Sequence, residues 1–287
     1  VGMKFENYDG LFRGVGLNYK YFWDEYDSKE SRFILTPKFN IELDRTTIKL
    51  DVKADYLNTE FADRLVNGAK NKYSYFIIAA EPSVEFSDEN YSVQLGVGLS
   101  YINGTSNETN DNSFVVYPKI KANVDLVKNI VMAYAGAEGG VSNNSYADFA
   151  EINPYISPNL TLAPTKQQYN IYAGLKGKLY HNISYNVRAS YISEDNKAMF
   201  VTNEINPTLQ TKEVYMNGNS FGVMYDMVNT FNLFGELNLN FSDAVTIGIS
   251  GEYNSYNADL NNVYNLPDAK VGAKIHADFT KQWYGGL

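Results

Sequence analysis

The side chains that could carry out chemistry in this chain are few and scattered. Cysteine is absent, which removes thiol nucleophiles and cysteine-based zinc sites. The two histidines are His181, in a predicted tight turn, and His276, between Lys274 and Asp278 on a polar face. A hydrolase would need a serine, a histidine and an orienting carboxylate or amide that converge at one surface, and His276 faces the wrong way for that. The sequence therefore predicts a protein that is not an enzyme, with no catalytic residue, metal site or cofactor.

Charged side chains form the second group of candidates, because they alternate with apolar residues and so share one face of their segments. From Lys49 to Asp55 this face carries both charge signs, which would either tune solute passage or form a cross-strand salt-bridge ladder that stiffens a wall. We favour the ladder, since a strongly ion-selective pore would show one dominant sign. The residues predicted to line an interior lumen are Lys49, Asp51, Lys53, Asp55, Lys176, Lys178, Arg188, Glu236, Glu252, Lys274, His276 and Asp278.

A basic patch is predicted on neighbouring strands of this face. Lys176, Lys178 and Arg188 would attract anionic solutes, or would pair with the lumenal carboxylates Glu236 and Glu252. The chain as a whole is acidic, with 24 basic and 33 acidic side chains and a formal charge of −9. Because this acidity comes without larger basic clusters, we expect no nucleic acid partner.

The elements that must position these side chains are strands, because the hydrophobic pattern has a period of two. Between Tyr91 and Tyr101 the odd-numbered residues are Tyr, Val or Leu and the even-numbered ones are Ser, Gln or Gly. A pleated strand separates such sets onto two faces, whereas a helix would mix them. Each run has about 9 to 11 residues, the length of a tilted strand that crosses a bilayer. Further runs are Leu11–Tyr21, Arg32–Leu43, Ile48–Tyr56, Tyr169–Leu179, Ile183–Tyr191, Val245–Tyr253 and Lys270–Phe279.

The connections between the runs are of two alternating kinds. Short polar turns are predicted at Leu43–Thr46, Ser87–Asn90, Tyr180–Ile183 and Phe241–Ala244. Long polar loops are predicted at Trp23–Ser31, Asn58–Lys72, Asn103–Asn112, Val141–Lys166, Ile192–Lys212 and Asn254–Leu266. Short turns at one end and long loops at the other are typical of an up-and-down barrel. We therefore predict an all-β fold, an antiparallel up-and-down transmembrane β-barrel of roughly 14 strands, or part of a larger barrel, with residues 1–287 as one domain.

The apolar face of such a barrel must point outward to lipid. A closed barrel of this many strands is too wide for side chains to fill its middle. A soluble β-sandwich would show the same alternation, but its strands average about 5–6 residues. No run of about 18 apolar residues exists, which excludes a transmembrane helix. The 24 tyrosines and 16 phenylalanines suit interfacial girdles at the run ends. We expect the bacterial outer membrane as the location and its lipid as a partner.

One stretch resembles a known family. It is similar to the barrel of TonB-dependent receptors and receptor-like proteins of the Bacteroidetes type. The similar residues are Asn153–Pro158, Leu162-Ala-Pro164 and Tyr169–Gly177, and Thr165 stands where that family has Glu. The resemblance implies a plug domain and an energy-coupling box ahead of a barrel of about 22 strands. Neither precedes the barrel here, so we expect that an N-terminal region, and a C-terminal one, is missing, or that this is a smaller receptor-like barrel without active uptake.

Two functional hypotheses follow. The first is a transport protein, receptor-like or porin-like, through whose lumen a solute passes. The second is a structural or partner subunit of an outer-membrane complex that does not transport. In that case the long loops contact other envelope proteins. The mixed charges of the predicted lumen favour a filled interior over an open pore.

Overall fold

The computed structural model describes residues 1–64, 70–107, 109–128, 130–204, 218–242, 244–260, 262–280 and 282–286. Within these residues, 14 strands form a single sheet in which each strand pairs antiparallel with the next one in sequence. This confirms the predicted all-β, up-and-down fold. The strands are β1 (Gly2–Glu6), β2 (Phe12–Trp23), β3 (Lys29–Leu43), β4 (Thr46–Arg64), β5 (Lys70–Asp88), β6 (Tyr91–Ser106), β7 (Thr109–Val127), β8 (Val131–Ser142), β9 (Thr165–Tyr180), β10 (Ile183–Thr202), β11 (Phe221–Ser242), β12 (Val245–Ala258), β13 (Ala269–Asp278) and β14 (Tyr284–Gly286).

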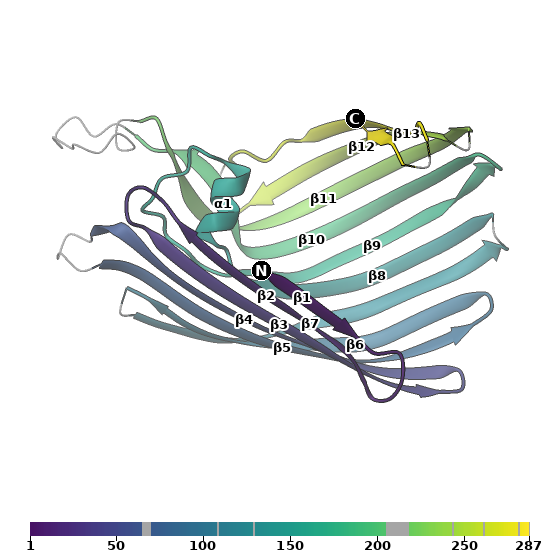
Figure 1. Cartoon of the computed structure of the whole chain (residues 1–287), viewed down its shortest axis with the longest axis horizontal. Helices are drawn as coiled ribbons and strands as arrows, with labels where there is room; N and C mark the ends of the chain where they lie inside the picture. Colours follow the sequence, from purple (N-terminus) through teal and green to yellow (C-terminus); the bar gives the residue numbers. More distant parts are fainter. Residues whose placement is uncertain are drawn as a thin grey trace.

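The sheet curls into a trough, as Figure 1 shows. The helix α1 (Tyr146–Ile152) lies on the concave side, near the end of the trough where the long connections gather. The short turns lie at the opposite end. In the part of the chain that is described, β1 pairs with β2 and β14 with β13, and no ladder joins β1 to β14. Searching the same residues finds no helix with the length and hydropathy needed to span a membrane.

The two faces of the sheet differ in chemistry, as the alternation predicts. On β6, Tyr101 is 43% exposed on the convex face, whereas its neighbour Ile102 is 1% exposed on the concave face. Large apolar side chains such as Phe33, Leu50 and Leu99 are likewise exposed on the convex face. An apolar surface this extensive is unusual for a protein in water and marks a membrane interaction surface.

The predicted short turns join β3 to β4, β5 to β6 and β9 to β10. Asp44 has a positive φ of 30° in the first of these turns, a conformation that Asp tolerates better than most residues. Four predicted long loops are partly wrong, because β4, β6, β10 and β12 continue into them. Residues 65–69 and 205–212 of two of these loops, and Asp243 of one turn, lie outside the described residues.

The strand extensions escaped prediction because the hydrophobic alternation stops before the pairing does. Between β6 and β7, Asn103 Nδ2 donates to Asn112 Oδ1 at 3.1 Å, and Thr105 Oγ1 donates to Asn110 Oδ1 at 3.3 Å. Polar cross-strand pairs hold this part of the ladder together, although its residues form no apolar face. A pattern that reads only hydrophobicity therefore ends the strand too early.

Tyrosine rings lie flat across glycines of the neighbouring strand on the concave face. A Cβ placed on Gly98 would lie 1.9 Å from the ring of Tyr117, and one on Gly174 would lie 2.4 Å from the ring of Tyr134. The strands can carry these rings only where the partner residue has no side chain. Tyr117 is 3% exposed and donates from its hydroxyl to Glu81 at 2.9 Å, so each ring also anchors a polar contact on the wall.

Candidate functional site

The concave face collects the side chains that were predicted to line the lumen. Cross-strand register settles which residues share it, because residues directly opposite in an antiparallel ladder lie on the same face. Lys176 lies opposite Asn186, which lies opposite Glu236, and Asp51 lies opposite Glu81. All the predicted candidates fall on this face by register and alternation; their role in solute passage stays a prediction.

Charge pairs connect the first half of the concave wall. Arg32 of β3 contacts Asp55 of β4 with two donors, Nε–Oδ1 at 3.0 Å and Nη2–Oδ2 at 2.8 Å. Lys53 lies 3.3 Å from the same carboxylate, and Lys49 pairs with Glu85 of β5. Lys49, Lys53 and Asp55 thus find partners along and across the strands, and Asp51 lies opposite Lys38 of β3 and Glu81 of β5. This is the geometry of a charge ladder along the wall.

The connection between β8 and β9 folds inward instead of forming the predicted long polar loop. This inward segment, residues 143–164, contains α1 and lies against the concave face of β2–β6 (Figure 1). It buries Tyr146, Phe149 and Leu162 almost completely. The prediction failed because the segment's apolar residues follow no regular period and are interrupted by Asn and Pro. The available signal was Ser145-x-x-Asp148, a helix N-cap pattern, and Asp148 N–H does donate to Ser145 Oγ at 3.1 Å.

Glu30 of β3 holds the start of α1. Its carboxylate accepts hydrogen bonds from Ser145 Oγ at 2.8 Å, from the N–H groups of Tyr146 at 2.7 Å and Ala147 at 3.2 Å, and from Thr59 Oγ1 at 2.8 Å. The side chain is 2% exposed. A carboxylate satisfies the otherwise unpaired N–H groups at a helix start, and the helix dipole favours it there. Glu30 therefore fixes both the position and the direction of the inward segment.

Asp148 ties α1 to the wall a second time. Its two oxygens contact Arg32 Nη1 at 2.7 Å and Lys20 Nζ at 2.9 Å. Arg32 thus bridges Asp148 and Asp55, and Asp55 is 0% exposed. The hydroxyl of Tyr146 donates to Asp24 at 2.8 Å, and burial, reinforced by this carboxylate, raises the pKa of Tyr146 well above its usual value. The hydroxyl consequently stays protonated and remains a donor at any physiological pH.

An apolar cluster completes the contact between the inward segment and the wall. Tyr146 packs edge-on against Phe61 of β4 and Phe22 of β2, with ring centroids 5.1 and 5.3 Å apart. The other buried members are Tyr73, Tyr75, Ile77, Ile102, Phe149, Ile156, Leu160 and Leu162. Backbone hydrogen bonds of 2.8 and 2.9 Å also join Ser157 and Tyr155 to Phe221, the first residue of β11. The segment is thus packed on several strands and narrows the interior at this end.

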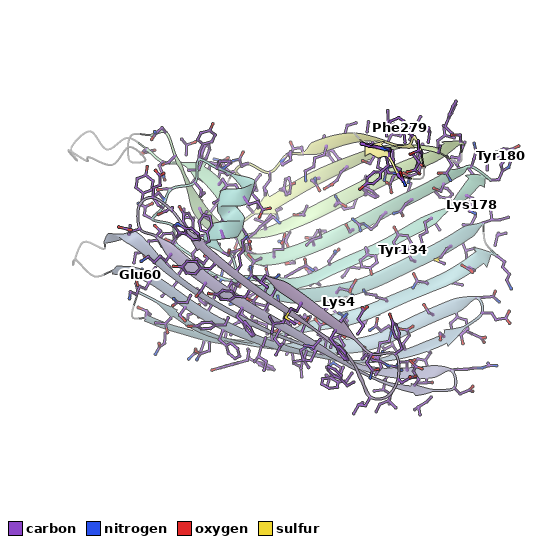
Figure 2. All side chains as sticks on the ribbon, in the orientation of Figure 1. Lys4, Glu60, Tyr134, Lys178, Tyr180 and Phe279 are labelled. Carbon is purple, nitrogen blue, oxygen red and sulfur yellow. The ribbon has the colours of Figure 1, made fainter. Side chains whose placement is uncertain are left out.

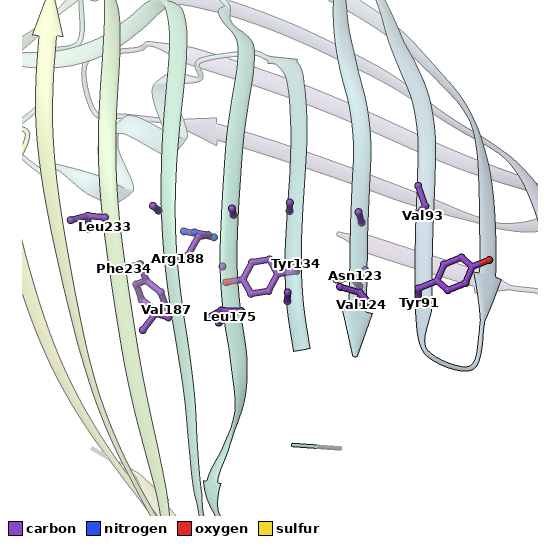
Figure 3. Close-up of a pocket in the computed structure, with 16 residues that line it drawn as sticks. Tyr91, Val93, Asn123, Val124, Tyr134, Leu175, Val187, Arg188, Leu233 and Phe234 are labelled. Atoms are coloured by element: carbon purple, nitrogen blue, oxygen red, sulfur yellow. The ribbon is translucent and has the colours of Figure 1, made fainter. Parts of the chain in front are cut away.

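The basic patch, Lys176, Lys178 and Arg188, lies on β9 and β10 toward the short-turn end. The alternative that these cations pair with Glu236 and Glu252 is wrong: Glu236 contacts Lys274 at 2.7 Å and Glu252 lies 3.9 Å from Lys270. The patch instead contacts aromatic rings. Lys176 Nζ lies 5.8 Å from the ring centre of Tyr134, and the Arg188 guanidinium lies 5.6 Å from that of Phe234 (Figure 3).

Neither histidine belongs to the basic patch or contacts the inward segment. His276 Nε2 lies 3.3 Å from Asp278 Oδ1 in an exposed pair on β13, and His181 packs on the ring of its neighbour Tyr180 in the turn. Among the described residues, no group of three or more His, Asp and Glu side chains could hold a metal ion.

Comparison with known proteins shows which solved structures share the fold of this chain. No protein-family model matches the chain, and no curated protein matches it. Among solved structures, the chain is similar to the copper transporter OprC, at 13% identity and a TM-score of 0.60, over 99% of this chain and 50% of OprC. It is similar to the FrpB iron transporter from Neisseria meningitidis, at 9% identity and a TM-score of 0.61, over 96% of this chain and 48% of FrpB. It also resembles the alcaligin receptor FauA from Bordetella pertussis, at 12% identity and a TM-score of 0.54, over 92% and 46% of the two chains.

OprC and FrpB are described as transporters and FauA as an outer-membrane receptor, and none of the three as an enzyme. The chain spans about half the length of the solved structures it matches. At identities this low the likeness establishes the fold alone, a curved wall of antiparallel strands shared with these outer-membrane barrels. Together with the apolar convex face, this fold places the chain in the outer membrane.

Proposed function

We propose that the chain forms the wall of an outer-membrane receptor that carries a solute through its interior. The observation that carries the proposal is the sidedness of the 14-stranded sheet, which exposes apolar residues on the convex face and charged residues on the concave one. Lipid covers the first face, and a polar path for a solute runs along the second. The likeness to OprC and FrpB supports the same assignment.

The inward segment gives the proposed path a constriction. It is packed against β2–β6 by an apolar cluster, and Glu30 and Arg32 hold α1 with charged contacts. A solute that enters at the long-connection end meets this segment first. Passage therefore requires the segment to move, or the solute to pass beside it.

The residues Asn153–Pro158 also bear on the bacterial lineage from which the protein comes. These residues, whose likeness to receptors of the Bacteroidetes type was noted above, lie in the inward segment. Tyr169–Gly177 follows on β9. We infer a receptor-like protein of that lineage, and the inward segment is the part of it that the resemblance describes best.

Conductance through planar bilayers tests the transport function. The intact protein should conduct weakly, and a Glu30→Ala/Asp148→Ala variant should conduct at least several-fold more, because it frees α1 from the carboxylate of residue 30 and from Arg32 and Lys20. Glu42→Ala, an exposed carboxylate on the same strand as Glu30, is the matched control and should behave as the parent. Heat-modifiable migration on a gel verifies that each variant is folded.

The opposite result is equally clear. If the folded variant conducts no more than the parent, and cells that carry either protein take up no solute, the chain is a structural subunit. In that case its long connections serve as contact surfaces for other envelope proteins.

A further inference from the structure

The cations of the basic patch have no carboxylate partners, unlike Arg32, Lys49 and Lys274 elsewhere on the concave wall. In the portion of the chain that is described, no Asp or Glu oxygen lies within salt-bridge distance of Lys176, Lys178 or Arg188, although the neighbouring strands carry several carboxylates. Those carboxylates are already engaged: Glu138 with Lys121 and the hydroxyl of Tyr172, Glu236 with Lys274, and Glu252 with Lys270.

A cavity of about 400 Å³ opens beside the two lysines. Its wall includes Lys176 and Lys178 from β9, Ser184 and Asn186 from β10, and Asn238 from β11. Asp125 of β7 is the one acidic side chain among the residues that line it. A volume of this size accommodates a small molecule. The lining thus combines two cations with amide and hydroxyl groups that can donate hydrogen bonds.

Tyr134 orients part of this lining. Its hydroxyl donates to Asn186 Oδ1 at 2.6 Å, which leaves the amide N–H groups of Asn186 free to donate. Figure 3 shows Tyr134 and Arg188 reaching toward each other from β8 and β10 across β9, where Gly174 leaves room for the ring. Figure 2 places Lys178 close to Tyr180, near the short-turn end of the trough. Arg188 adds its charge one register step beyond Asn186, on the same face.

The electrostatic setting favours an anion at this place. The patch and Asp125 together carry a net charge of +3 − 1 = +2, on a chain whose formal charge is −9. A local positive region with low-dielectric walls concentrates anions, and lysine binds phosphate and carboxylate oxygens as a point charge. Since no carboxylate of the described residues lies within salt-bridge distance of these cations, an external oxyanion can pair with them directly.

We propose that Lys176, Lys178 and Arg188, with Asn186, form a binding site for the phosphate or carboxylate group of a small anionic solute on the concave face. The inference rests on the proposed transport function, for which it names the substrate class. The site lies toward the short-turn end, and the inward segment lies at the other end. A solute would therefore reach the site after passing that segment.

The test is binding of inorganic phosphate and, in a second arm, acetate to the intact protein in neutral detergent, measured by calorimetry at low salt. We expect millimolar or tighter binding of at least one anion, and at least tenfold weaker binding by Lys176→Gln/Lys178→Gln/Arg188→Gln. Lys128→Gln is the matched control: it removes an exposed cation from the turn that joins β7 and β8 at the same end of the sheet, and it should bind as the parent.

Two results would overturn the site: no binding of either anion by the parent, or equal binding by the triple variant. The transport measurement separates this inference from the proposed function. If the parent transports solutes but the triple variant carries anionic and neutral ones with unchanged preference, the site is wrong and the function stands. If phosphate binds at the patch but nothing is transported, the function is wrong and the site stands.

Discussion

The two ends of the concave face carry charge in opposite ways. At the long-connection end, Glu30, Arg32 and Asp55 are largely buried. Arg32 forms an ion pair with Asp55, and Glu30 accepts hydrogen bonds from the start of α1. At the short-turn end, Lys176 and Lys178 are exposed and contact no carboxylate among the described residues. A buried charge without a partner is costly, so the first end fixes structure. An exposed charge costs little, so the second end is free to meet a ligand.

The largest effect that would test this comparison is the loss of Arg32. We expect Arg32→Met to destabilise the folded chain by about 3–5 kcal/mol, because it leaves the buried carboxylate of Asp55 without its main partner. Urea unfolding in detergent, followed by tryptophan fluorescence, measures the change. The double variant Arg32→Met/Asp55→Leu should recover much of the loss, since an apolar pair replaces the ion pair. A loss under about 1 kcal/mol in the single variant would mean that this end does not depend on its buried charges.

Glu30→Gln is expected to weaken the same end by about 2–3 kcal/mol. The amide keeps one acceptor but loses the charge that the N–H groups of Tyr146 and Ala147 contact. Chymotrypsin should then cleave after Tyr146 and Phe149 many times faster than in the parent. Glu42→Gln serves as the exposed control. Unchanged protection of α1 would show that the apolar cluster alone holds the inward segment.

A steric substitution tests whether the tyrosine rings also hold the wall. Gly98→Ala should cost about 1–3 kcal/mol, because the new methyl group overlaps the buried ring of Tyr117. Gly251→Ala on β12 has no heavy atom within 4 Å of the new Cβ and should change stability by less than about 0.5 kcal/mol. Thermal migration shifts on a gel compare the two variants. Equal effects would indicate a general cost of alanine in these strands.

The smallest expected effect lies at the other end. Lys178→Gln should leave the unfolding free energy within about 0.5 kcal/mol of the parent, since this exposed cation contacts no carboxylate in the described chain. The same urea titration used for Arg32→Met measures it. A loss above about 1 kcal/mol would show that Lys178 has a structural partner, and the contrast between the two ends would then fail.

Much of the fold followed from the sequence, because one physical rule governs it. Lipid on one face and water on the other impose a period of two, so runs such as Tyr91–Tyr101 reveal both the strands and their sidedness. The tight turns at Leu43–Thr46 and Tyr180–Ile183 followed from their Asp, Asn and polar residues. Where that rule stops, as on the polar extensions of β6 and β7, prediction stopped as well.

The site was less accessible, because its partners depend on register and long-range packing. The sequence marks Asp55 and Lys176 as residues of one face. It does not show that Asp55 pairs with Arg32, or that Glu236 pairs with Lys274 and so leaves Lys176 without a carboxylate partner. Glu30 was missed altogether, since a single Glu at the start of a strand carries no local signal of the helix it contacts 115 residues later. The fit of Tyr117 against Gly98 likewise depends on the register of two strands.

The long sequence separation between the inward segment and the strands it contacts has a consequence for how the protein folds. Ladders between consecutive strands close short loops, so hairpins can add to the sheet one after another with little entropic cost. The hydrogen bonds from the inward segment to β2–β5 join residues 87 to 128 apart in sequence, from Tyr75–Leu162 to Lys20–Asp148. They can form only after β2–β5 and β8 stand together. Docking of α1 should therefore be a late event, and changes at Glu30 should speed undocking far more than they slow the growth of the sheet.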